Sequence, residues 1–273
     1  MLLFRAMRAK DDSMIKAVTA IHYLTPLREG GSLPAIVEAD DGEQYVMKFV
    51  GAGQGPKALI AELVAGEIAR ALGLHVPELV FIELDPAIGR SEPDQEIQDL
   101  LRASTGLNLG LKYLPQAFAF NMLLQPPPPP DLASAIVWFD AYVTNVDRTP
   151  RNANMLLWQE ELWLIDHGAA LYFHHDWDNY LERSLTPFPL IKDHTLLSFA
   201  SAIPQADDVL RPRLTGEVIG SIIDLIPTAW LNGETMFANH TDHREAYTSY
   251  LRTRLEASSV FVEEAQRAHA KLM

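Results

Sequence analysis

The order of the apolar segments constrains the fold of this chain more than any other feature. Three runs with strand character come first, at residues 17–24, 33–39 and 44–50. Asp41 and Gly42 stand between the second and third runs, and an Asp-Gly step in that place is a strong signal for a β-hairpin. The chain is therefore expected to begin with antiparallel strands.

A helix is predicted directly after these strands, over residues 57–72. Its apolar side chains recur three and four positions apart, and Gly73 marks its end. Shorter elements follow, with strands expected at residues 79–84 and 109–114 and a helix at residues 94–103.

The second half of the sequence has mainly helical patterns. Five prolines at residues 126–130 form a stiff spacer, and a helix is expected over residues 131–141. Short strands at residues 155–158 and 162–165 form a second hairpin. Beyond about residue 193 the chain is expected to be mostly helical.

Strands with one main helix therefore come first and helices second. This order indicates an α+β fold with two unequal halves. We place the halves at residues 1–115 and 116–273. A cleft between two such halves is a natural site for a ligand.

The charge of the chain limits its partners. It has 22 Lys and Arg residues against 36 Asp and Glu residues, a formal net charge of −14. Such a surface repels nucleic acid phosphates and anionic lipids, so binding to nucleic acid or to membranes is not expected. The lack of cysteine excludes disulfides and thiolate metal sites. No segment has the roughly 20 apolar residues of a membrane span or the pattern of a secretory signal, so a cytoplasmic location is expected.

The residues with the clearest chemistry lie around the second hairpin. Asp147, Asn152 and Asn154 precede it, and Asp166 follows it, with Gly168 two residues later. Phosphoryl transfer needs one carboxylate to orient or deprotonate the attacking hydroxyl. It needs a second carboxylate, helped by an Asn, to hold magnesium through oxygen ligands. Asp147 suits the first role, and Asp166 suits the second together with Asn152 or Asn154.

Residues 138–173 resemble the catalytic core of HipA-like kinases and, more distantly, that of phosphoinositide kinases. The Asp147-Arg148 pair followed by Asn152 matches the Asp-Arg-x-x-x-Asn catalytic loop of those families. Asp166 begins an Asp-His-Gly sequence that resembles their metal-binding motif. The resemblance implies a two-lobed, protein-kinase-like fold that binds ATP and Mg²⁺, with a small antiparallel-sheet lobe and a larger, mainly helical lobe.

Two points within this segment stay open. Spacing favours Asn152 as the metal ligand, whereas Asn154 directly precedes an apolar strand, as the metal-binding Asn of kinases often does. Arg148 is a candidate catalytic residue that either neutralises phosphate charge or pairs with a local Asp.

Lys48 lies in the third predicted strand. Alternation places it on the same side as Val46 and Val50, so we expect it to point inward, where its charge needs a partner. In kinase-like folds a strand Lys contacts phosphate and pairs with a Glu of the following helix. Glu62 is favoured over Glu67 because its helical neighbours are small and let the helix approach the sheet.

A glycine-rich turn joins the first two predicted strands. Gly30 and Gly31 permit close approach of the backbone, so amide groups there can contact phosphate. No Gly-Lys-Ser/Thr follows, which excludes a Walker loop. The turn resembles the Gly-Ser phosphate loop of HipA-like proteins, with Ser32 as the matching serine.

His174 and His175 follow the metal-binding motif, near Asp176 and Asp178. Their spacing matches no zinc-ligand pattern. We expect these residues in a polar surface loop.

The resemblance and the charged residues together predict an ATP- and magnesium-dependent kinase. It would transfer a γ-phosphate to a hydroxyl-bearing acceptor, with a protein Ser or Thr as the favoured one. Two other functions stay open: a nucleotide-binding regulator without catalysis, and a kinase for a small molecule.

Overall fold

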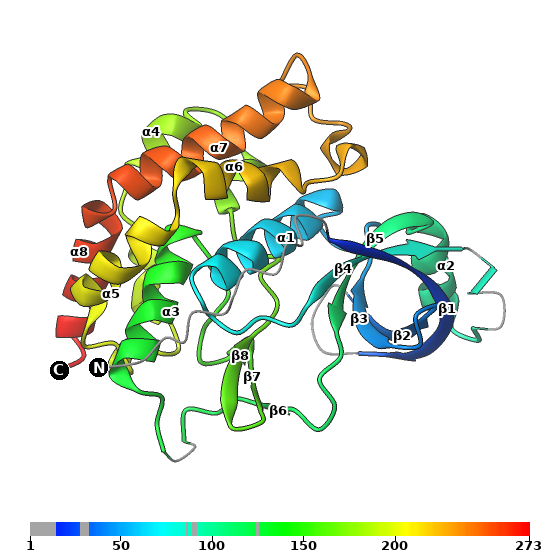
Figure 1. The fold of residues 1–273 in the computed structure, drawn as a ribbon, viewed down its shortest axis with the longest axis horizontal. Helices are drawn as coiled ribbons and strands as arrows, with labels where there is room; N and C mark the ends of the chain where they lie inside the picture. The colour runs from blue at the N-terminus through cyan, green and yellow to red at the C-terminus, as the bar shows by residue number, and fades with distance from the viewer. Residues whose placement is uncertain (1–14, 28–32, 86, 89–91, 124–125) are drawn as a thin grey trace.

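The first part of the fold is a small closed β-barrel. The computed structural model describes residues 15–27, 33–85, 87–88, 92–123 and 126–273, and Figure 1 shows the barrel at one end of the molecule. Its strands are β1 Lys16–Pro26, β2 Ala35–Ala39, β3 Gln44–Lys48, β4 Leu79–Leu84 and β5 Gly106–Lys112. Neighbours follow the order β1-β2-β3-β5-β4, and β4 pairs back with β1.

The predicted hairpin is present, but the barrel is not wholly antiparallel. β2 and β3 pair antiparallel around the Asp-Gly turn, where Gly42 has a φ of 80°. β1 and β4 run parallel, with Lys16 opposite Val80. A parallel partner needs a long crossover. Here the chain passes through β2, β3 and α1 before it returns as β4. Turn signals in the sequence are local, so they do not reveal that β4 pairs with β1.

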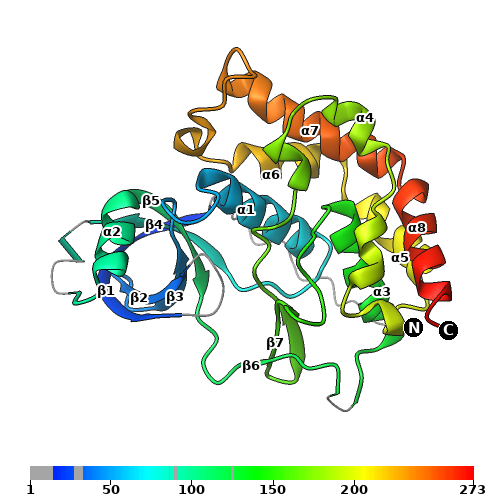
Figure 2. The ribbon, with the colours of Figure 1, turned by 180° about the vertical axis from the view of Figure 1, so that it is seen from behind.

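Helix α1, Pro56–Ala71, lies between the barrel and the helices of the second half of the chain (Figures 1 and 2). Pro56 starts it, at a position where a missing N–H costs no helical hydrogen bond. Gly73 follows it with a φ of 83°, which a glycine adopts without strain. Every residue from Leu59 to Gly66 is buried, so this helix is a core element.

The rest of the chain is mainly helical around a small three-stranded sheet. The sheet has the order β6-β7-β8, with β6 Phe118–Ala119, β7 Met155–Trp158 and β8 Glu161–Leu164. The α-helices are α2 Gln95–Ala103, α3 Pro130–Tyr142, α4 Tyr180–Ser184, α5 Ile203–Leu210, α6 Gly216–Asp224, α7 His240–Glu256 and α8 Ser259–Ala270. Short 3-10 turns lie at Tyr172–His175, Pro189–Asp193, Leu197–Phe199, Arg211–Arg213 and Thr228–Leu231. None of the described helices is both long and apolar enough to cross a membrane.

Buried apolar side chains form two clusters. One fills the barrel and reaches α2 through Ile97 and Leu101. The other joins α1 to α3 and the C-terminal helices. Helix α1 thus packs with the helical part of the molecule, although the sequence places it between two barrel strands. The division at residues 115 and 116 stays a prediction.

A buried arginine fixes the end of α3. The guanidinium of Arg254 donates to the carbonyls of Ala141 and Tyr142, at 2.8 and 2.9 Å, and to those of Ser184 and Thr186. A cation at a helix C-terminus is favoured by the helix dipole and satisfies carbonyls that have no helical partner. The loop that follows α3 therefore starts from a fixed point.

Two glycine substitutions test the packing of the barrel end. A Cβ on Gly51, just after β3, would lie 2.8 Å from backbone atoms of Ala103 at the end of α2. We expect Gly51→Ala to lower the free energy of unfolding by about 1–3 kcal/mol, because a backbone cannot move aside as a side chain can. Urea denaturation at neutral pH measures it.

Gly220→Ala is the matched control. Gly220 lies in α6, and a Cβ there meets nothing within 4 Å. This substitution should raise stability by about 0.5–1 kcal/mol through helix propensity. If Gly51→Ala and Gly220→Ala shift stability in the same direction, the close approach of Gly51 to α2 is wrong.

Candidate active site

Three charged side chains from distant parts of the chain meet at one point. The amine of Lys48, at the end of β3, lies 2.5 Å from an oxygen of Glu62 on α1 and 2.5 Å from an oxygen of Asp166 after β8. Glu62 is fully buried and Lys48 is 12% exposed, whereas the side chain of Asp166 is 47% exposed. The cluster is therefore closed on the helix side and open at Asp166.

Glu62 is also bonded to the motif that contains Asp166. The backbone N–H of His167 donates to Oε2 of Glu62 at 2.7 Å, and ring atom Nδ1 of His167 lies 3.4 Å from Oε1. Burial alone would raise the pKa of Glu62, but the Lys48 ammonium and His167 outweigh it and lower this pKa to about 2. For Lys48 burial acts to lower the pKa, and the two carboxylates reverse that and raise it.

A small residue lets α1 lie close to β4, because a Cβ on Gly66 would lie 2.9 Å from a methyl group of Leu79. Glu62 of this helix contacts Lys48, as the sequence predicted. Glu67 faces elsewhere, with its carboxylate 3.2 Å from Arg70.

Asp147 lies in the loop after α3, and two asparagines face its carboxylate. Nδ2 of Asn152 donates to Oδ2 of Asp147 at 2.7 Å, and Nδ2 of Asn154 lies 3.4 Å from the same oxygen. The pKa of Asp147 is raised because partial burial and the charge of Asp166 outweigh these hydrogen bonds. The two carboxylates therefore lie near enough to repel each other.

The second hairpin brings Asn154 beside Asp166. Met155 pairs with Leu164, and the N–H of Ile165 donates to the carbonyl of Asn154 at 3.0 Å. Asn154 and Asp166 both have a positive φ, 48° and 55°. Asn and Asp accept this left-handed conformation more readily than other residues with a side chain. It turns the chain at both ends of the hairpin.

Arg148 pairs with a local Asp, one of the two roles left open by the sequence. It is fully buried, and its Nε donates to Oδ2 of Asp140 at 2.6 Å. Its Nη1 donates to the carbonyl of Asn154. Sequence reasoning missed Asp140, although one signal was present: a carboxylate among the apolar side chains of a helix requires a cation nearby.

Comparison with known proteins decides the family. The family model described as HipA-like kinase matches residues 20–259. This chain belongs to the HipA-like kinase family. Membership makes it a phosphotransferase. No curated protein matches the chain.

Solved structures similar to this HipA-like kinase are also kinases. The proinflammatory kinase CtkA of Helicobacter pylori is 15% identical, with 94% of this chain and 98% of that chain covered and a TM-score of 0.50. The Golgi casein kinase with Mn and ADP bound is 12% identical, with 94% and 75% covered and a TM-score of 0.49. The likeness to CtkA shows a kinase-like fold.

Other expected features of this HipA-like kinase have different outcomes. Gly30, Gly31 and Ser32 lie outside the described residues. The expectation of a surface position for His174 is wrong: this ring is fully buried, 3.0 Å from the hydroxyl of Tyr247. The reason is that the ring of His174 packs against an aromatic side chain of α7, which lies far from His174 in the sequence.

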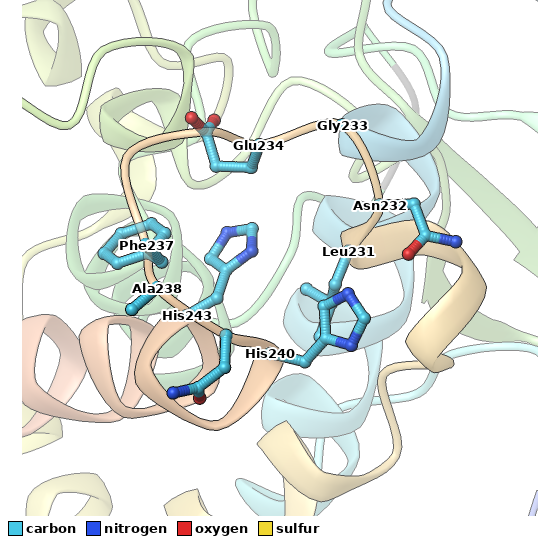
Figure 3. A pocket seen from close by; sticks show the side chains of 9 residues that line it. Leu231, Asn232, Gly233, Glu234, Phe237, Ala238, His240 and His243 are labelled. Carbon is cyan, nitrogen blue, oxygen red and sulfur yellow. The ribbon is translucent and has the colours of Figure 1, made fainter.

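A pocket of about 180 Å³ lies at the start of α7 (Figure 3). Its lining comes from residues 231–234, residues 237–240 and His243. Glu234, on its wall, lies 3.2 Å from Lys57, which also donates to the carbonyl of His174. The pocket is formed by a different segment from the Lys48 cluster.

The pKa of Glu62 gives a test of the Lys48 cluster. Its folded pKa of about 2 lies below the ordinary value of 4.5, so its contribution to stability is complete above pH 4.5 and falls as the pH drops toward 2. Between pH 6 and pH 3 the wild type should lose about 2 kcal/mol more stability than Glu62→Gln. Urea denaturation across that range measures the difference.

Glu67→Gln is the control for that series. It removes a carboxylate from the same helix outside the cluster, so its stability should follow the wild-type pH dependence. Parallel curves for wild type and Glu62→Gln would show that the Lys48–Glu62 contact contributes nothing.

Proposed function

We propose that this HipA-like kinase transfers the γ-phosphate of ATP, with magnesium, to the hydroxyl of a protein Ser or Thr. The observation that carries the proposal is the contact of the Lys48 amine with both Glu62 and Asp166. It joins a candidate phosphate-binding cation to a candidate metal-binding carboxylate at one point. Phosphoryl transfer depends on this positioning and charge neutralisation rather than on covalent help.

Lys48 would bind the α- and β-phosphates, and Glu62 would hold it in place. Glu62 is suited to that role because it is buried and has a second anchor in His167. Asp166 is suited to meet a ligand because its side chain remains half exposed. From the sequence alone, we propose that the turn of Gly30, Gly31 and Ser32 contacts phosphate. We further propose that residues 1–115 and 116–273 form the two lobes around the nucleotide.

The donor set near Asp166 fits magnesium. Carboxylate and amide oxygens are the ligands that this ion prefers, and it keeps several waters besides one or two carboxylates. Nδ2 of Asn154 is the donor in its contacts with Asp147 and Asp166, so its Oδ1 takes no part in them and would be the atom that binds an ion. The repulsion between Asp147 and Asp166 also favours a cation near them. Among the described residues no three His, Asp or Glu side chains gather at a metal site, so a carboxylate–amide site is the one that these side chains support.

Asn154 is the better candidate for the metal ligand, with Asn152 holding Asp147. Nδ2 of Asn154 lies 3.5 Å from the carbonyl oxygen of Asp166, whereas the amide of Asn152 bonds to the carboxylate of Asp147. The position of Asn154 directly before β7 agrees with this choice.

Asp147 would act on the acceptor. Its raised pKa suits a group that takes a proton during the transfer. The hydroxyl oxygen of the acceptor forms a bond to the γ-phosphorus while the bond from that phosphorus to the bridging oxygen breaks. The bridging oxygen keeps the electron pair and leaves with ADP, and the hydroxyl proton passes to Asp147. The net charge of −14 favours a cationic or neutral acceptor over an anionic one.

Two substitutions separate chemistry from nucleotide binding. Asp147→Ala should lower phosphate transfer by about 10²–10⁴-fold, the range of general acid–base catalysis, and leave ATP binding within a factor of about two. Asp166→Ala should weaken magnesium-dependent ATP binding. Transfer of ³²P from γ-labelled ATP to a basic protein substrate, together with calorimetric binding of ATP, measures both. Normal turnover in both variants would end the proposal, and binding without transfer in the wild type would favour a regulator without catalysis.

The two asparagines can be tested against each other. Asn154→Ala should weaken magnesium-dependent ATP binding by about tenfold or more, as loss of one metal-site group does. Asn152→Ala should keep that binding and lower kcat, because Asp147 loses its partner. The reverse pattern would assign the metal to Asn152. Titration of both variants with magnesium at a fixed ATP concentration measures this binding.

A further inference from the structure

A buried carboxylate in α3 has three side-chain partners. Asp140 is fully buried, and Oδ2 accepts from Nε of Arg148 at 2.6 Å and from Nε2 of His194 at 2.8 Å. Its other oxygen accepts from Nδ2 of Asn145 at 2.8 Å. Burial would raise the pKa of Asp140, but Arg148 and His194 hold it well below the ordinary range. A carboxylate so deep in a core is costly unless every oxygen is paired, as these are.

The proton position on His194 follows from its other contact. The backbone N–H of Leu196 donates to Nδ1 of His194 at 3.0 Å, so Nδ1 is an acceptor. Nε2 must then carry the ring proton, so Nε2 is the donor in the hydrogen bond to Asp140. The next residue ties the same segment to the loop after α3, because the N–H of Thr195 donates to the carbonyl of Arg148 at 3.0 Å.

The partners of Asp140 reach the candidate catalytic residues through backbone atoms. Arg148 donates through Nη1 to the carbonyls of Asn154 and, at 3.5 Å, of Ile165. These carbonyls belong to Asn154 itself and to the residue before Asp166. The amide oxygen of Asn145 accepts from the N–H of Asp147 at 3.1 Å. One buried carboxylate therefore fixes the backbone at three points of the site.

We propose that Asp140 and His194 are positioning residues for phosphoryl transfer, which set the backbone geometry of residues 145–154 and of Asp166 without touching the nucleotide. The inference rests on the proposed function, because it assigns these residues to the same reaction. It separates the site into two parts. Lys48 and Glu62 serve the nucleotide, and the Asp140 network serves the acceptor side and the metal residues.

A partly buried carboxylate in the helical part provides a control away from the site. Asp207 on α5 is 15% exposed, and it accepts from Nε1 of Trp138 at 2.8 Å and from the hydroxyl of Ser258 at 3.2 Å. These contacts do not include residues 145–154 or Asp166. Asp207→Asn thus removes a hydrogen-bonded charge from a packed helix without a contact to those residues.

The experiment compares kcat, ATP affinity and melting temperature in both variants. Asp140→Asn should lower kcat on the order of 100-fold, because a displacement of about 1 Å in the reacting groups has that effect. Its affinity for ATP without metal should stay within about twofold of the wild type. Asp207→Asn should keep the wild-type kcat whatever its melting temperature.

His194 gives a test by rescue. His194→Ala should lower kcat in the same way as Asp140→Asn. His194→Gln keeps an N–H donor at about the same distance from the backbone as Nε2 of histidine. It should therefore recover a large part of the kcat that His194→Ala loses, even where the two variants have the same melting temperature. A purely structural role would make recovery follow stability instead.

The outcomes separate this inference from the proposed function. A wild-type kcat in Asp140→Asn, or a loss seen only in ATP affinity, would overturn the positioning role. A wild type that binds ATP but transfers no phosphate would overturn the proposed function. In that case hydrogen exchange tests the Asp140 network. Asp140→Asn should speed the exchange of amides in residues 145–154, and Asp207→Asn should not. Equal exchange in the two variants would overturn the positioning role.

Discussion

The amine of Lys48 is the group on which the arrangement of the site depends. It is nearly buried, and a buried ammonium is costly unless opposite charges surround it. Glu62 and Asp166 meet that need from two different elements. Lys48 extends from the barrel, whereas α1 packs with the helical part of the molecule. The ion cluster therefore joins the barrel to the helices, at the point where we propose that a triphosphate binds.

The backbone conformation at the second hairpin also determines how the site residues are arranged. Asn154 and Asp166 flank the short hairpin of β7 and β8, and the register of that hairpin brings them side by side. Their positive φ values turn both side chains out of the hairpin ladder at its open end. A residue with a branched side chain in either place would strain the turn. The amide and the carboxylate thus suit the backbone conformation as well as the proposed cation site.

The sequence predicted the local features of this site and missed the long-range ones. The Asp-Gly turn and the periodicity of residues 57–72 gave the hairpin and the helix, since both signals are local. Alternation placed Lys48 on one side with Val46 and Val50, and this is the half-buried side of β3 that meets α1, whereas Tyr45 and Met47 fill the barrel. Small neighbours gave Glu62. The parallel closure of β1 against β4, the burial of His174 and the role of Asp140 depend on partners far along the chain, such as His194. No local pattern encodes those partners.

Two buried carboxylates divide the control of the site between them. Glu62 holds a side chain, the amine of Lys48, which under the proposed function exchanges partners when phosphate binds. Asp140 holds backbone through Arg148 and Asn145, and the proposed positioning role requires that backbone to stay fixed. Both carboxylates are fully buried, so they differ in the surroundings of their partners and not in depth. The amine bound by Glu62 also contacts the half-exposed Asp166, whereas Arg148 and His194, the partners of Asp140, are themselves buried. Ionic interactions strengthen as water is excluded, so the Asp140 network is the more rigid of the two, and the Lys48 cluster is the one that a ligand can enter.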